Sequence, residues 1–389
     1  MENMKINLSS QVSFLKLKNI KTESNQKNNE SIEQTKRFLY CLLYDDQINK
    51  KLIIYQIKYS NELKFNNISS IEQKIKYEIK YKEDIGNDNI HLIAKATLDN
   101  KIYLIFITNN NICNIFAGIF DIEIDKYFPI IIENSSKLKE LIKQLPDKDY
   151  ITIFEQNKIF FFGGLIDQSK KRNNSISPIT VQISNEEESK QISSINDFIL
   201  NKSCVYFDIE KLDLENQNFP ENSLIPRYKL GGTCDNSIIY LIGGFTSYLN
   251  NQENNDNICN NLQFTKIFDD KMYQFSIAKF EGENPKEMID SDILLIKNRF
   301  IVSFSGYKYA KIWILDIKTN IGINYDLKEK IKLEEFNKEN IFLRMINCDI
   351  NENSNEINLI LVKIIFNEAN KNIKFDIINR IFQINIGSN

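Results

Sequence analysis

The stretch Ile238-Ile239-Tyr240-Leu241-Ile242-Gly243-Gly244-Phe245 decides the fold. An apolar run of this length is too short for most helices and fits a strand that is buried on both faces. The two glycines after it mark a place where the backbone takes a positive φ, or where no side chain fits. The pattern returns upstream in Ile159–Leu165, which reads IFFFGGL, and downstream Phe300–Phe304 is followed by Ser305-Gly306. The sequence therefore predicts an all-β chain built from repeats.

Groups of strand-like segments recur along the chain in six cycles, which begin near residues 37, 90, 149, 228, 292 and 341. Without insertions one cycle is about 50 residues long, which is the length of one kelch repeat. Residues 167–197 and 248–261 are rich in Asn, Ser and Glu and interrupt this rhythm, so we interpret them as surface insertions. Leu and Ile at helical spacing in residues 136–145 predict a short helix.

Residues 226–275 resemble a kelch repeat. Arg227 precedes the apolar run, the glycine pair ends it, and the aromatic stretch Met272–Phe275 follows. Residues 149–215 are a second clear match, through Ile159–Gly164 and Tyr206, and residues 292–327 are a weaker one, through Phe300–Gly306 with Trp313 or Tyr325. The first, second and sixth cycles lack the glycine pair. The resemblance implies one kelch-like β-propeller domain over residues 1–389, most simply with six blades of four antiparallel strands.

Strand-like sequence at both ends predicts how such a ring closes. Met4–Leu17 and Ile381–Ile386 could share one blade, and residues 1–36 are then an N-terminal strand with a polar loop. In this arrangement we expect the double glycines to lie near the central channel, and Gly243→Val to destabilise the fold by at least a few kcal/mol. The aromatic residues at positions 240, 273 and 313 are expected to pack between blades.

Composition excludes several classes of protein. The formal net charge is -3, from 49 basic and 52 acidic residues, so neither nucleic-acid binding nor membrane attraction is expected. No run reaches the roughly 18 apolar residues of a membrane span, and the first 19 residues lack a signal peptide's apolar core. Dispersed cysteines without a CxxC motif argue against a zinc site or a disulfide framework and suit a reducing compartment; they are Cys41, Cys113, Cys204, Cys234, Cys259 and Cys348. We therefore expect a cytoplasmic protein, with cytoskeletal association as an option.

Residues for catalysis are scarce. His91 is the only histidine, which leaves too few ligands for the copper site of galactose-oxidase-type propellers, and no sialidase-type Asp box occurs. The acidic pairs Asp45-Asp46, Asp269-Asp270 and Asp290 with Asp292 are interpreted as turn residues, although a glycosidase needs two facing carboxylates. The lysines of residues 74–82 are interpreted as the solvated face of an edge strand. No catalytic, cofactor-binding or metal-binding residue is therefore predicted.

Two functions remain open from the sequence. The first is a non-catalytic propeller that serves as a protein-interaction module or scaffold subunit of a larger assembly, because propeller loops present broad surfaces. In that case the two insertions are the first places to look for contacts with protein partners, although AT-rich codon bias alone explains their composition. The alternative is a propeller enzyme or glycan-binding protein with its site at the channel mouth.

Overall fold

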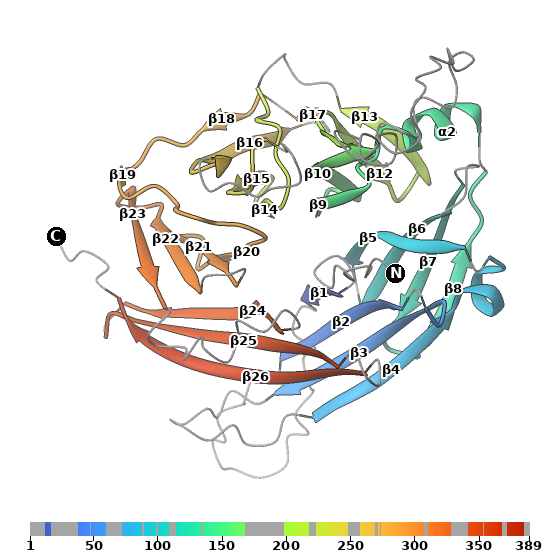
Figure 1. Ribbon diagram of the computed structural model, residues 1–389, viewed down its shortest axis with the longest axis horizontal. Coiled ribbons are helices and arrows are strands. Elements are labelled where there is room, and N and C mark those ends of the chain that lie inside the picture. The colour runs from blue at the N-terminus through green and yellow to red at the C-terminus, as the bar shows by residue number, and fades with distance from the viewer. Residues whose placement is uncertain are drawn as a thin grey trace, which may run out of the picture. The chain divides into compact units, whose positions relative to one another are not determined.

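A computed structural model describes the chain at residues 12–16, 38–46, 48–59, 72–87, 89–98, 100–108, 114–133, 135–167, 198–217, 223–247, 257–268, 271–272, 274–306, 310–327, 341–352, 354–367 and 372–384. Within these residues the chain is mostly β, as predicted, and it forms six small sheets, the number that the predicted six-bladed β-propeller requires (Figure 1). Two compact units make up the chain: residues 1–134 with 345–389, and residues 135–344. Each unit is described by itself.

The first unit holds the first, second and sixth sheets. The first sheet has the order β1 (Val12–Lys16), β2 (Phe38–Asp46), β3 (Lys51–Tyr59), β4 (Glu72–Lys80), and the π-helix η1 (Tyr81–Ile85) follows it. The second sheet has the order β5 (Ile90–Leu98), β6 (Lys101–Thr108), β7 (Ile115–Asp121), β8 (Lys126–Ile130). The sixth sheet has three strands, β24 (Ile341–Asn351), β25 (Glu356–Asn367) and β26 (Asn372–Gln383), and the first residues of β24 belong to the second unit.

The second unit opens with the predicted short helix, α2 (Ser136–Ile142), whose N-cap Ser135 accepts a hydrogen bond from the Leu138 N–H. The third sheet contains β9 (Lys148–Glu155), β10 (Lys158–Asp167), β11 (Phe198–Leu200), β12 (Cys204–Asp208) and β13 (Asp213–Gln217). The fourth contains β14 (Gly231–Asp235), β15 (Ile238–Ile242), β16 (Leu262–Phe268), β17 (Lys271–Met272) and β18 (Ser276–Ile277). The fifth contains β19 (Glu281–Gly282), β20 (Asp292–Ile296), β21 (Phe300–Ser305), β22 (Lys311–Asp316) and β23 (Ile321–Asp326).

Three hairpins at equivalent positions of the second unit use the same turn. The turn between β9 and β10 is centred on Gln156-Asn157 and that between β14 and β15 on Asn236-Ser237. The turn between β20 and β21 is centred on Lys297-Asn298 and is followed by one further loop residue, Arg299. Both residues of each turn have φ between 47° and 61°. Two successive positive φ values define a type I′ turn, whose twist matches that of the flanking strands. The hairpins predicted around residues 155–157 and 297–298 are thus confirmed.

The second strand of each hairpin is buried along most of its length, as its unalternating apolar sequence predicts. β10 is buried from Lys158 to Ile166, and β21 along all six residues. Their side chains fill cores with the neighbouring sheet; Phe160, Phe162, Tyr206, Ile239 and Leu241 form the core between the third and fourth sheets. Each fully buried Phe or Leu side chain contributes about 1.5–3 kcal/mol relative to an exposed one.

Several expectations about single strands are corrected. The third strand of the fourth sheet is β16 (Leu262–Phe268), whereas residues 271–277 give only the short strands β17 and β18 beside it. Gly231-Gly232 lie in strand β14, and Arg227 precedes that strand. The predicted terminal strand Ile381–Ile386 begins within a longer strand, β26, because the chain pairs with β25 without a break from Asn372 to Gln383. Among the described residues the sixth sheet has three strands instead of four.

Other expectations lie partly outside the described residues. These are the insertions, of which only residues 167 and 257–261 are described, the position Tyr273, and most of residues 1–36. Of the terminal strands, β1 pairs with β2 in the first sheet, and β26 pairs with β25 in the sixth. Within the described ranges, no pairing joins the two termini in one sheet.

Candidate functional site

The double glycines of the second unit form its junctions between consecutive sheets. Gly164 donates its N–H to the Arg227 carbonyl and Gly244 donates to the Met288 carbonyl, each at 2.8 Å. A Cβ atom on Gly163 would lie 2.3 Å from the Arg227 oxygen, and one on Gly243 would lie 1.6 Å from the Met288 oxygen. All four glycines have φ between 65° and 87°. The glycines are therefore needed because the chain that enters the next sheet lies directly against their backbone.

The strand β10 corrects the idea that the glycine pair ends the strand. β10 continues through Gly163-Gly164 to Asp167, and Gly163 pairs with Tyr150 of β9. Among the described residues the glycines contact the next sheet, and their expected position near a central channel stays a prediction.

Ser305-Gly306 form a third junction with different chemistry. The Ser305 hydroxyl donates to the Ile289 carbonyl at 2.7 Å and accepts from the Ile289 N–H at 3.3 Å. A Cβ on Gly306 would lie 2.2 Å from the Leu343 oxygen. The hydroxyl thus holds the entering chain by its side chain, and the second residue stays glycine because of the close carbonyl.

Arg227 connects two of these junctions. Its carbonyl receives the Gly164 N–H, and its guanidinium donates to the Gly243 carbonyl at 3.1 Å. The guanidinium also donates to the Cys259 sulfur at 3.1 Å and to Gln263 Oε1 at 2.5 Å. The Arg227 side chain is fully buried. Arg227 thereby joins the glycine pair of the third sheet to that of the fourth.

The electrostatics around Arg227 are unusual for a buried arginine. Burial lowers the pKa of its guanidinium, and the neighbouring Cys259 acts in the opposite sense. Among the described residues no carboxylate lies within ion-pair distance of it. The kelch resemblance singled out Arg227, but Cys259 fell in a predicted insertion and Gln263 was not noticed, because only the folded chain brings them together.

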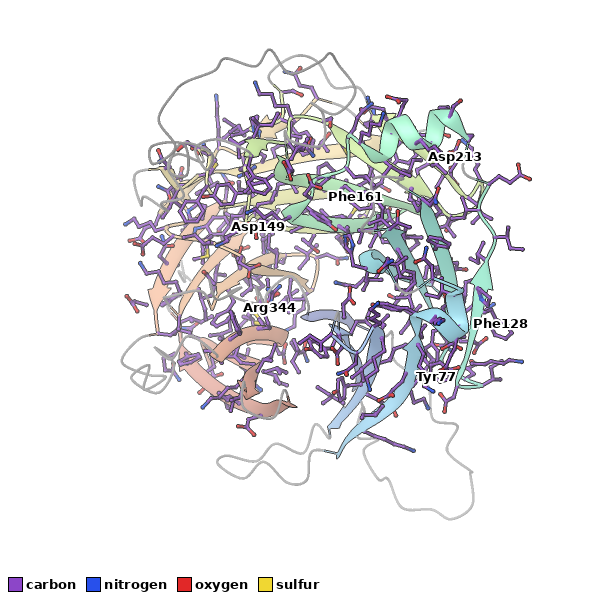
Figure 2. The ribbon with its side chains drawn as sticks, turned by 45° about the vertical axis from the view of Figure 1, so that its right-hand side comes forward. Tyr77, Phe128, Asp149, Phe161, Asp213 and Arg344 are labelled. Atoms are coloured by element: carbon purple, nitrogen blue, oxygen red, sulfur yellow. The ribbon has the colours of Figure 1, made fainter. Side chains whose placement is uncertain are left out.

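A second polar cluster lies at the starts of β9, β14 and β20, the first strands of the three hairpins of the second unit. The Lys229 N–H donates to the Asp149 carbonyl, and the Asp290 N–H donates to the Lys229 carbonyl. These three residues have φ of 57°, 54° and 47°. Arg344 binds Asp292 at 2.7 Å and Asp290 at 3.2 Å; Figure 2 labels Asp149 and Arg344. The acidic pair thus takes part in one charge cluster with an arginine.

The charges of this cluster compensate one another. Burial acts to lower the pKa of the Arg344 guanidinium, but Asp292 and Asp290 outweigh it and hold that pKa above its ordinary value. Both carboxylates are engaged by the same cation. A glycosidase needs two carboxyl groups that face a substrate, and this arrangement gives each of them another task.

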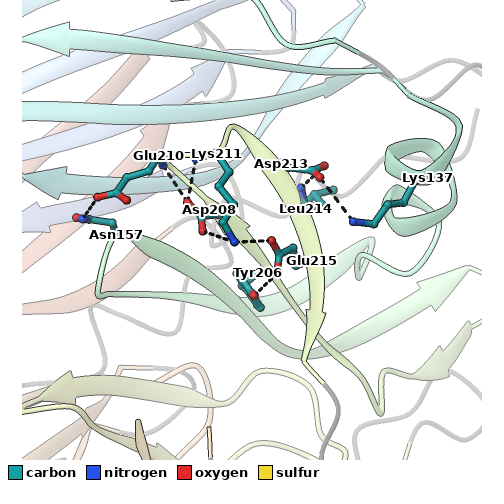
Figure 3. Close-up of polar contacts among 9 residues, drawn as sticks. All are labelled: Lys137, Asn157, Tyr206, Asp208, Glu210, Lys211, Asp213, Leu214 and Glu215. Carbon is teal, nitrogen blue, oxygen red and sulfur yellow. Dashed lines mark hydrogen bonds and ion pairs between the residues drawn. The ribbon is translucent and has the colours of Figure 1, made fainter. Parts of the chain in front are cut away.

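The β12–β13 hairpin carries a third polar network (Figure 3). The Asp208 carboxylate accepts the N–H groups of Glu210 and Lys211 at 3.0 Å, so it closes the turn. The Tyr206 hydroxyl and the Lys211 ammonium both donate to Glu215, at 2.5 and 2.9 Å. The Tyr206 bond and then Lys211 lower the pKa of Glu215. Every carboxylate in this group has a partner, and the network stabilises the hairpin.

The first unit has a buried carboxylate, Asp45, beneath η1. It accepts hydrogen bonds from the Tyr81 hydroxyl and, at 2.8 Å, from the Leu92 N–H. Burial and then Asp45 raise the pKa of Tyr81 well above its ordinary value. Asp46 behaves as predicted for a turn residue, because its carboxylate accepts the N–H groups of Ile48 and Asn49.

The remaining residues singled out in the sequence have structural surroundings. His91 lies partly buried on β5, opposite Ile107. Lys76 forms an ion pair with Asp125 at 2.8 Å. Trp313 is fully buried, as predicted, and donates its indole N–H to the Glu283 carbonyl at 2.8 Å. The pair Asp269-Asp270 lies outside the described residues.

The described ranges contain no group of three or more His, Cys, Asp or Glu side chains arranged to hold a metal ion. They also contain no helix with the length and apolar character needed to span a bilayer.

No protein-family model and no curated protein matches the chain. A solved structure described as "Structure of YjhT" is similar with a TM-score of 0.44 at 9% sequence identity, and the match covers 84% of this chain and 95% of that chain.

Proposed function

We propose that this chain is a kelch-like propeller without catalytic activity that binds protein partners as a scaffold subunit of a cytoplasmic assembly. The three glycine junctions support the kelch-like relationship, because residues of the resemblance occupy equivalent contacts in three consecutive sheets. The pairing of Asp290 and Asp292 with Arg344 supports a non-catalytic role.

The observation that carries the proposal is the exposed apolar sequence of the outer strand β8 and its flanks. Ile124 is 61% exposed, Phe128 40% and Ile131 92%. β8 is the last strand of the second sheet (Figures 1 and 2). Large apolar side chains that remain in water along one strand favour a protein partner that covers them.

The polar surroundings of these side chains suggest how a partner binds. The Lys126 ammonium lies 5.3 Å from the centre of the Phe128 ring, and Glu123 and Asp125 are exposed in the preceding turn. Pro129 removes one backbone donor from this edge strand, which makes it a poor template for an added strand. The partner is therefore expected to bind through side chains, with an apolar centre and a charged rim.

The test is affinity purification of the tagged chain from its native cell, followed by mass spectrometry. Wild type is compared with the double variant Phe128→Ser/Ile131→Ser and with the control Ile317→Ser, whose side chain is 41% exposed in the turn between β22 and β23. A stoichiometric partner that is lost only with the double variant supports the proposal. Recovery of wild type alone, or equal recovery of the partner with all three chains, refutes it.

A further inference from the structure

Arg227 and Cys259 are two buried groups that lie in direct contact. Arg227 has no exposed surface and Cys259 is 5% exposed. One guanidinium nitrogen of Arg227 donates to the Cys259 sulfur at 3.1 Å. Both residues belong to the second unit.

The other partners of the guanidinium are neutral. They are the carbonyls of Gly243 at 3.1 Å and Asn261 at 3.5 Å, and the amide oxygen of Gln263 at 2.5 Å. The Nε atom of Arg227 has no acceptor among the described residues. Among the described residues, the Cys259 sulfur is the one partner of this cation that can carry a negative charge.

A buried arginine cannot solve this problem by losing its proton. The guanidinium remains protonated in proteins, and an isolated charge away from water is strongly destabilising. A thiol beside a cation, by contrast, readily gives up its proton. The lowest-energy arrangement then places the negative charge on sulfur.

We propose that the Cys259 sulfur is a thiolate in the folded protein and is the buried counter-ion of Arg227. The ion pair holds the guanidinium against the Gly243 carbonyl while the Arg227 carbonyl accepts the Gly164 N–H. Cys259 is thus the residue that allows an arginine to join the third and fourth sheets without a carboxylate. Gln263 completes this role, since its amide nitrogen donates to the Ser223 carbonyl and its oxygen faces the guanidinium.

The first test is vibrational spectroscopy of the S–H stretching band at neutral pH, because a thiolate has no such band. Cys259→Ser is expected to leave the band of the folded protein unchanged. The matched control Cys204→Ser is expected to lower it by one cysteine's share, since burial holds the pKa of the Cys204 thiol well above its ordinary value. Equal losses in the two variants would overturn the proposal, because Cys259 would then be a neutral thiol.

The second test separates charge from shape. Cys259→Asp and Cys259→Asn introduce side chains of the same size, and only the aspartate keeps a negative charge beside Arg227. The aspartate variant is expected to melt at a higher temperature than the asparagine variant. An asparagine variant of equal or higher melting temperature contradicts the ion pair.

Wild type alone provides a third measurement that does not depend on how the variants fold. The chain has six cysteines. Against a free-cysteine standard, the S–H band of the folded protein is expected to integrate to no more than five of them. A band that accounts for all six is incompatible with a thiolate.

Discussion

Replacing Gly243 by alanine should test the junction between the fourth and fifth sheets directly. The new Cβ would lie 1.6 Å from the Met288 oxygen and 2.6 Å from the Met288 carbonyl carbon. Both are backbone atoms, so no side-chain rotation relieves the contact. The Gly244 N–H also donates to that oxygen at 2.8 Å, and any shift of Met288 weakens this bond.

The expected loss of stability follows from three contributions. A residue with a Cβ at φ of 65° costs about 1–2 kcal/mol. Forcing a methyl group into filled space costs about 1–3 kcal/mol, and the hydrogen bond contributes about 0.5–1.5 kcal/mol. Together they give a destabilisation of about 2.5–6.5 kcal/mol. In a unit of this size that lowers the melting temperature by about 5 to 25 °C, and Gly243→Val should lower it further.

Gly86→Ala is the matched control. Gly86 has φ of 82°, but no atom of the described part of the chain lies within 4 Å of the position of its Cβ. The alanine there should cost only the backbone contribution of about 1–2 kcal/mol. Thermal unfolding followed by circular dichroism measures both variants. Equal shifts for Gly86→Ala and Gly243→Ala would show that the Met288 carbonyl does not exclude a side chain, and would refute the junction.

Three further perturbations address other contacts. Gly118→Ala places a Cβ about 2 Å from the Tyr127 ring and should lower the free energy of unfolding, measured in urea, by about 1–3 kcal/mol. The same change should lower it by less when Tyr127→Ala is already present. An equal loss in both backgrounds would contradict the contact. Asp316→Asn breaks a nearly buried bidentate pair with Arg299, at 2.6 and 2.9 Å, and should cost about 2–4 kcal/mol; a loss below about 1 kcal/mol in thermal melting would refute this. Burial, followed by Asp46 and other neighbours, raises the pKa of Tyr44 to about 12. The neutral phenol therefore stabilises the fold fully below pH 10, and this stability is lost as the pH rises toward 12. The difference in tyrosinate absorbance between wild type and Tyr44→Phe should appear above pH 11, and a difference that appears near pH 10 would contradict the burial of Tyr44.

The sequence predicts the fold where local patterns specify it. Apolar runs without alternation marked β10 and β21, which are buried along their length, and the dipeptide turns marked the hairpins. The sequence explains the glycine pairs correctly, by a positive φ and by a lack of space for a side chain, but it does not reveal which atoms occupy that space. That neighbour is a carbonyl of the next sheet, many residues away along the chain.

Local pattern fails where pairing decides between similar segments. Residues 262–268 and residues 271–277 both have a strand-like sequence. Only the observed pairing of β15 with β16 shows that residues 262–268 form the third strand of the fourth sheet. The cluster around Arg227 was out of reach for the same reason. A kelch-like motif identifies Arg227 in the sequence. No local pattern identifies Cys259 and Gln263, because their role is to accept hydrogen bonds from the Arg227 guanidinium, which belongs to another segment.

The glycine junctions also bear on the order in which the second unit is made. Gly164 needs the carbonyl of Arg227, Gly244 needs that of Met288, and Gly306 packs on that of Leu343. In each case this carbonyl belongs to a residue that lies later in the chain than the glycine. On the ribosome, each sheet therefore emerges before the residue that completes its junction. We expect the sheets of the second unit to become stable in order from the N-terminal side, each one only after the start of the next sheet has been synthesised. A chain that ends after the third sheet lacks the Arg227 carbonyl that accepts the Gly164 N–H.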